Sequence, residues 1–182
     1  MSGGPEVSVV VPFRDDEERV GALARRLAGH LRALGLSFEL LFVDEDARDN
    51  SVALLLLLRD RELPELRVLT ASGALGFAVG AQVARGRALW FFDVRQADAP
   101  LAPFAWARRR LAEGIDVVRV SGRFTVARRT RVWPVVAGLP GRGDAFASAL
   151  AARARRRRLA VDTAAGREAP LWARLLGAFA KA

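Results

Sequence analysis

Short, continuously apolar runs alternate with longer amphipathic segments along most of this chain. Residues 7–12 are rich in valine without polar alternation, which is typical of a strand buried on both faces. Residues 16–34 begin with acidic residues, carry leucines at helical spacing and end at Gly35, which predicts an amphipathic helix. The same criteria predict further strands at 38–43, 66–69, 88–92 and 115–120, and further helices at about 50–61, 75–85 and 101–112.

The pattern is less regular in the last third of the chain. Residues 119–143 show no clear period and are expected to be irregular. A helix is expected from Asp144 through the arginines of 153–158, followed by a short strand at 159–162. The segment 168–182 has a stripe of large apolar side chains and predicts a C-terminal amphipathic helix.

Strands separated by helices of this length predict an α/β domain with a mostly parallel sheet and helices on both faces. Acidic side chains lie where three of the predicted strands end: Asp15 after the first, Asp44, Glu45 and Asp46 after the second, and Asp93 after the fourth. Because ligands of such sheets bind at the carboxyl ends of the strands, we expect these carboxylates to share one site.

Composition adds limits to this picture. The net charge is +9, and all but one of the 29 basic residues are arginine, which we interpret as codon bias. No nucleic-acid-binding signature accompanies the arginines, so no nucleic-acid partner is expected. The absence of cysteine excludes a thiolate metal site. The longest apolar run, 52–58, is far shorter than the roughly 20 residues of a membrane span, and a cytoplasmic protein is expected.

Four short motifs follow one another in a familiar order. They are "VVVPFRDDEER" at 9–19, "FVDEDARDNS" at 42–51, "SGALGFAVGA" at 72–81 and "DVRQADAPL" at 93–101. Each lies at the end of a predicted strand or the start of a predicted helix. Together they resemble the family 2 glycosyltransferases of the GT-A fold, and most closely the branch of dolichyl- and polyprenyl-phosphate sugar transferases. The resemblance is good over residues 6–120 and loose beyond.

The resemblance implies one GT-A-like domain over residues 1–182. Residues 6–120 would form the nucleotide-binding half and 121–165 a shortened acceptor half. The implied reaction is inverting transfer of a sugar from a nucleotide-diphosphate sugar to an unknown acceptor, such as a lipid phosphate or a polysaccharide. The sequence does not predict the sugar, the base or the oligomeric state.

The resemblance also implies roles for single residues. Pro12, Asp15, Asp44 and Glu45 would bind the nucleotide, since carboxylates accept hydrogen bonds from ring N–H and hydroxyl groups. For Asp44 an alternative is that it caps the following helix, and for Asp49 the cap is the better interpretation. Asp144 would be the catalytic base, unless it only caps its own helix.

The family's metal site differs in this chain. Asp93 matches the first acidic residue that would hold Mg²⁺ or Mn²⁺ against the diphosphate, but Arg95 replaces the second. At about 4 Å and an effective dielectric near 20, each unit of charge changes the interaction by about 4 kcal/mol, so divalent binding becomes doubtful. Two interpretations follow: Arg95 binds the diphosphate directly without metal, or the domain is a degenerate nucleotide- or partner-binding module. Phe77, Ala74 and Arg14, which replace family-typical residues, favour the second.

The segment 168–182 raises the question of a membrane. A similar amphipathic segment lies at the membrane in the lipid-phosphate branch, so the resemblance implies a peripheral contact at the inner face. Alternatively, the same apolar stripe packs on the domain itself.

Overall fold

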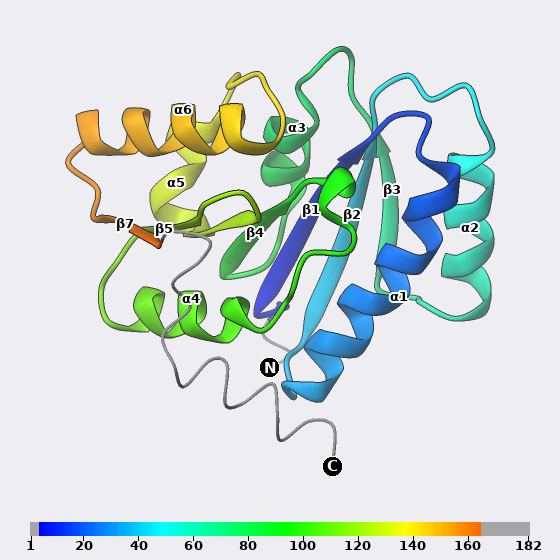
Figure 1. Ribbon diagram of the computed structural model, residues 1–182, viewed down its shortest axis with the longest axis horizontal. Helices are drawn as coiled ribbons and strands as arrows, with labels where there is room; N and C mark the ends of the chain where they lie inside the picture. Colours follow the sequence, from blue (N-terminus) through cyan, green and yellow to red (C-terminus); the bar gives the residue numbers. More distant parts are fainter. Residues whose placement is uncertain (1–3, 165–182) are drawn as a thin grey trace.

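The computed structural model describes residues 4–164 of the 182-residue chain. Figure 1 shows a central sheet with helices packed on both of its faces. The strands are β1 Val7–Phe13, β2 Phe38–Asp44, β3 Leu66–Thr70, β4 Ala88–Phe92, β5 Val117–Val120, β6 Phe124–Arg128 and β7 Val161–Ala164. The helices are α1 Glu17–Ala33, α2 Ser51–Arg61, α3 Gly76–Val83, the 3₁₀ turn η1 Val94–Gln96, α4 Pro103–Ala112, α5 Arg129–Val136 and α6 Gly143–Arg156.

The sheet has the strand order β3-β2-β1-β4-β6-β5-β7. The first four strands in this order run parallel, and β6 lies antiparallel to both of its neighbours. The chain adds β2 and β3 on one side of β1 and then returns to place β4 on the other side. This reversal beside β1 is the position at which parallel sheets bind ligands.

Two apolar layers hold the helices on the sheet. On one face, α1, α2 and α4 bury their leucines, alanines and Phe104 against alternate strand residues such as Val9, Phe42 and Trp90. On the other face, α3, α5 and α6 pack against the intervening residues, such as Val10 and Phe91. Because successive strand residues point to opposite faces, a central strand with helices on both sides must be apolar at nearly every position. That requirement explains the continuous valine run of β1.

The predicted α/β class with a mostly parallel sheet is confirmed, and the elements up to residue 120 differ from prediction by two residues or fewer at each end. The main error is the segment 119–143, predicted to be irregular. It contains β6 and α5, because Phe124 and Val126 bury one face of a hairpin strand while Thr125 and Ala127 bury the other. The helix α5 forms although Pro134 lies inside it.

The last strand also lies within two residues of its prediction, since β7 begins and ends two residues later than predicted. After α6 the chain turns through Arg158, which has a positive φ of 58°, and this turn takes up the residues before β7. No helix within residues 4–164 is long and apolar enough to cross a membrane. The predicted amphipathic helix at 168–182 lies outside the described residues.

Candidate active site

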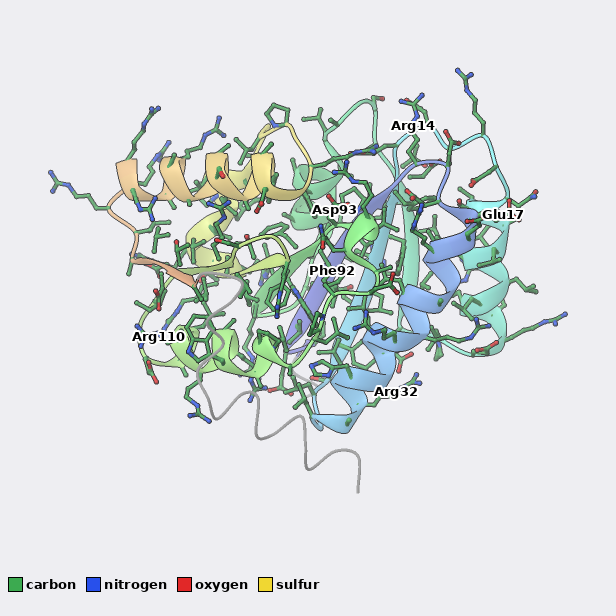
Figure 2. All side chains as sticks on the ribbon, in the orientation of Figure 1. Arg14, Glu17, Arg32, Phe92, Asp93 and Arg110 are labelled. Carbon is green, nitrogen blue, oxygen red and sulfur yellow. The ribbon has the colours of Figure 1, made fainter. Side chains whose placement is uncertain are left out.

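A carboxylate–guanidinium pair follows the central strand β4. Asp93 is the residue after β4, and its Oδ1 accepts hydrogen bonds from the backbone N–H of Arg95 at 3.0 Å and from Arg95 Nε at 3.1 Å. Arg95 Nη2 donates to Asp93 Oδ2 at 2.7 Å. The two side chains meet because Asp93 is the N-cap residue of the 3₁₀ turn η1 and Arg95 lies within this turn. In Figure 2, Asp93 lies toward the same upper end of the strands as Arg14, and Arg32 lies near their lower end.

The two partners of this pair differ in exposure. The Asp93 side chain is 7% exposed, whereas that of Arg95 is 60% exposed. The hydrogen bond to Asp93 raises the pKa of the Arg95 guanidinium above its ordinary value, and the attraction of the carboxylate acts in the same direction. Arg95 is therefore a permanent cation whose charge faces outward from the strand end.

A cavity of about 280 Å³ lies beside this pair. Its charged lining comes from Asp93, Arg95, Arg123 and Asp144. Part of its apolar lining is Phe77, whose ring packs against Phe91 and Phe146 at centroid distances of 5.5 and 4.3 Å. The cavity therefore combines polar groups at its charged side with an apolar floor, as small-molecule sites generally do.

Asp144 enters the cavity from the far half of the chain. Its Oδ1 accepts hydrogen bonds from Arg119 Nη2 at 3.1 Å and from the backbone N–H of Gly122 at 3.2 Å. The Arg119 hydrogen bond holds the pKa of the Asp144 carboxyl below its ordinary value. Asp144 does not cap its helix, because α6 begins at Gly143 and the residue at the cap position is Arg142. Its carboxylate, 58% exposed, is left for another role.

The start of α6 lies directly against the Asp93–Arg95 pair. Gly143 has a positive φ of 50°, and a Cβ at this position would lie 2.6 Å from Asp93 Oδ2 and 3.5 Å from Arg95 Nη2. Only glycine tolerates both this backbone conformation and this close approach. Gly143 thus allows residues that are some fifty positions apart in sequence to line one cavity.

The carboxylates that follow β1 and β2 are hydrogen-bonded to nearby backbone. Asp15 Oδ1 accepts from the N–H of Arg48 at 2.6 Å, and Asp44 Oδ1 accepts from the N–H of Ala47 at 2.7 Å. Asp49 accepts from the N–H of Glu17 at 2.8 Å and of Ser51 at 3.0 Å, the first residues of α1 and α2, whereas the cap position of α2 is Asn50 and not Asp49 as predicted. These bonds tie the two loops together at the upper edge of the sheet.

Glu45 is almost completely enclosed, with its side chain 1% exposed. Its Oε1 accepts a hydrogen bond from the N–H of Gly76 at 2.7 Å, and its Oε2 forms an ion pair with Arg142. Beside it, the N–H of Gly141 donates to the carbonyl of Ala74 at 2.9 Å. The segment before α6 is thereby fastened to the start of α3, where Gly76 also lies close to Pro12.

The predicted site residues therefore fall into two groups. Asp93, Arg95 and Asp144 line the cavity together, whereas Pro12, Asp15, Asp44 and Glu45 do not line it. Sequence analysis overlooked Gly122 and Arg123, which also line the cavity. A glycine in a three-residue gap between two short apolar runs is a hairpin signal, and it was available at 121–123.

The residues at this edge do not fit the divalent ion that the resemblance implies. Among residues 4–164 there is no group of three histidine, aspartate or glutamate side chains placed to hold a metal. Both carboxylate oxygens of Asp93 already accept hydrogen bonds from Arg95. A metal ion at Asp93 would also have to approach a guanidinium that carries the same sign of charge.

Comparison with known proteins places the fold. No family model matches the chain. It is 31% identical over 133 residues to an undecaprenyl-phosphate 4-deoxy-4-formamido-L-arabinose transferase of Pseudomonas paraeruginosa; the match covers 70% of this chain and 38% of that protein. The chain therefore spans well under half the length of this curated relative.

Solved structures give the same result at the level of the fold. A glucosyl-3-phosphoglycerate synthase from Mycobacterium tuberculosis, in complex with UDP, has a TM-score of 0.69 at 17% identity, covering 98% of this chain and 77% of that one. A mannosyltransferase from Pyrobaculum calidifontis, in complex with GDP-mannose and Mn²⁺, has a TM-score of 0.65 at 16% identity, covering 90% and 56%. The chain has the GT-A fold, and its predicted resemblance to family 2 glycosyltransferases is confirmed.

Proposed function

We propose that this domain transfers a sugar, with inversion, from a nucleotide-diphosphate sugar to an acceptor oxygen. The observation that carries the proposal is the cavity lined by Asp93, Arg95 and Asp144 beyond the carboxyl end of β4, the strand that lies beside β1 where the strand order switches. At this position the cation can stabilise the negative charge of the departing diphosphate, and a carboxylate can take the proton of the acceptor. The proposal is supported by the bound ligands of the fold neighbours, which are UDP and GDP-mannose.

In the proposed transfer, the bond between the anomeric carbon and the diphosphate oxygen breaks, and its electron pair stays on the diphosphate. The acceptor oxygen forms the new bond to the anomeric carbon from the opposite face. Asp144 takes the proton if the acceptor is a hydroxyl, because its carboxylate lines the cavity and is ionised at neutral pH. An acceptor phosphate is already ionised and needs no base.

The nucleotide is proposed to lie across the tips of β1 and β2, with its diphosphate directed toward β4. Asp15 and Asp44 remain the proposed partners of the base and ribose, because each carboxylate has a second oxygen besides the one bound to backbone. Pro12 shapes the neighbouring turn. Glu45 is proposed to support the wall of this site, since its enclosed carboxylate already serves Gly76 and Arg142.

A lipid-phosphate acceptor is the finer part of the proposal, and the name of the Pseudomonas relative supports it. Exposed arginines at the end of α6, Arg155 to Arg158, would favour peripheral contact with an anionic bilayer at the cytoplasmic face. A flotation assay with anionic and neutral vesicles tests that contact: binding only to anionic vesicles is expected, and equal recovery with both would contradict it.

Calorimetry with UDP, GDP and their sugars tests the proposed function itself. We expect saturable binding of at least one of these nucleotides. A transfer assay with undecaprenyl phosphate and the sugar nucleotide that binds then tests the acceptor. Silence with every nucleotide would instead support the alternative of a degenerate domain that binds a partner.

A further inference from the structure

We propose that the Arg95 guanidinium, fixed on Asp93, does the work of the divalent cation, so that this site binds and activates a nucleotide diphosphate without metal. This inference rests on the proposed function and concerns the same cavity. It begins from the misfit between the residues after β4 and a metal ion.

The first step concerns Asp93. Its carboxylate is 7% exposed and receives three hydrogen bonds from Arg95, two on Oδ1 and one on Oδ2. A metal ion would have to displace the two guanidinium bonds from a nearly enclosed carboxylate, and the displaced cation would remain nearby. The aspartate is therefore already occupied by a cation that belongs to the chain.

The second step concerns the donors that remain on Arg95. A guanidinium has five N–H groups in a fixed plane, and Asp93 uses one on Nε and one on Nη2. The other three lie on the side of the fork away from these two bonds, in a side chain that is 60% exposed and lines the cavity. Two parallel N–H groups match two oxygens of a phosphate, which is the geometry that makes arginine a strong phosphate ligand.

The third step is the balance of charge. Two carboxylates with one divalent ion sum to zero, and so do Asp93 and Arg95. The pair thus offers a diphosphate the same net charge as an acidic pair loaded with metal. The two other charged lining residues, Arg123 and Asp144, also balance one another. The charge that builds up on the departing diphosphate is then met by N–H donors already in place, which is how preorganised sites lower a barrier.

The fourth step is rigidity. Arg95 is anchored through its backbone N–H as well as its side chain, and the Asp93 carboxylate is packed under Gly143. A guanidinium held in one place loses little further freedom when a ligand binds. A flexible surface arginine would lack this advantage.

The test compares nucleotide binding with and without metal. UDP and GDP are titrated by calorimetry into the wild-type protein in EDTA and again in Mn²⁺. We expect dissociation constants that agree within about threefold, because the cation is built in. Arg95→Ala should weaken binding about 10- to 100-fold under both conditions, since a hydrogen bond between charged groups contributes roughly one to two powers of ten. Arg32→Ala, which removes an exposed arginine near the lower end of the strands, is the matched control and should change nothing.

The converse variant, Arg95→Asp, restores an acidic pair. We expect it to bind Mn²⁺ in the absence of nucleotide, seen as loss of the free-ion signal in electron paramagnetic resonance, and to need Mn²⁺ for nucleotide binding. Circular dichroism checks that each variant is folded; where Arg95→Ala is not, the wild-type comparison and Arg95→Lys, which keeps the charge but loses the fork, carry the test. Wild-type binding that requires Mn²⁺ would overturn the inference and leave the proposed function standing. Absence of binding in both buffers would overturn both.

Discussion

The ends of β2 and β4, which lie on either side of β1, each carry a carboxylate bound to an arginine, and the two pairs have different roles. After β2, Glu45 is paired with Arg142, which comes from a segment almost a hundred residues away. After β4, Asp93 is paired with Arg95, two residues along the chain. Both carboxylates are nearly enclosed, but the Arg142 side chain is 30% exposed and that of Arg95 60% exposed.

The difference lies in where the arginine originates. Arg142 comes from a distant segment and reaches inward to Glu45, so its charge serves to hold these two segments together. A local arginine turns back on its own strand end and leaves three of its five guanidinium N–H groups unused by the carboxylate. The same type of ion pair therefore has a structural role at Glu45 and provides a ligand-binding group at Asp93. Variants on the two sides should accordingly separate stability from function.

The largest effect is expected on the cavity side, at Asp144. Asp144→Asn keeps the shape of the side chain but removes the base, so the turnover number with a hydroxyl acceptor should fall by about 10²- to 10⁴-fold. Nucleotide affinity and the free energy of unfolding should change little, because the carboxylate is half-exposed. Steady-state kinetics and denaturation measure the two. Asp60→Asn, at an exposed pair on α2, is the control. Full turnover with a hydroxyl acceptor would remove Asp144 from the mechanism.

The next effect is expected on the wall side. Arg142→Ala leaves the enclosed Glu45 carboxylate without its cation, and we expect the free energy of unfolding to fall by about 2–3 kcal/mol. Urea denaturation measures it. Arg25→Ala, which breaks an exposed pair with Glu62, should leave the midpoint unchanged. Equal midpoints for both variants would show that the Glu45–Arg142 pair does not stabilise the fold.

A smaller effect is expected at Gly143, where the two sides meet. Gly143→Ala forces a Cβ against Asp93 Oδ2 in a left-handed backbone conformation, and should lower the free energy of unfolding by about 1–2 kcal/mol. It should also weaken nucleotide binding, because the Asp93–Arg95 pair must shift. Gly138→Ala has a similar φ of 64° with no neighbour in reach, so it separates backbone strain from contact. If both variants bind nucleotide like the wild type, the proposed role of the close approach is wrong.

The same contrast explains how much of the molecule could be predicted from sequence. The strands β1, β2 and β4 are buried on both faces, so each appears as a nearly continuous apolar run between helices. The hairpin strand β6 has the mixed sequence FTVAR and is followed at once by a helix that contains Pro134. Short runs of this kind look irregular in sequence, and only their pairing with β4 and β5 makes them strands.

The site follows the same division. The identity of Asp93 and the charge reversal at Arg95 were visible in the motifs. That both oxygens of Asp93 would be engaged by Arg95 depends on the turn η1, which no local pattern indicated. The partnership of Glu45 with Arg142 depends on tertiary structure alone. From the sequence, the carboxylates were expected to share one site because they all follow strands. In the structure, Asp93 and Glu45 differ in role because one is paired with a nearby arginine and the other with a distant one.

The smallest expected effect concerns Glu39, which forms ion pairs with Arg67 and Arg85 at the amino ends of the strands. Burial would raise the pKa of the Glu39 carboxyl, but hydrogen bonds from Ser8, the Arg85 backbone and the side chains of Arg67 and Arg85 outweigh burial, and the pKa lies below its usual 4.5. A folded-state pKa below the unfolded value stabilises the fold above about pH 4.5. This stability is lost as the pH falls through the folded pKa.

We therefore expect the free energy of unfolding, measured by urea denaturation, to be flat near neutral pH and to decline below pH 4.5. In Glu39→Gln the part of that decline due to Glu39 should disappear. Nucleotide affinity at neutral pH should be unchanged, because the cluster lies at the amino ends of the strands, away from the cavity. An altered affinity would mean that the Glu39 cluster at the amino ends of the strands is coupled to the cavity at their carboxyl ends. The distinction between ion pairs that stabilise the fold and ion pairs that bind the ligand would then be wrong.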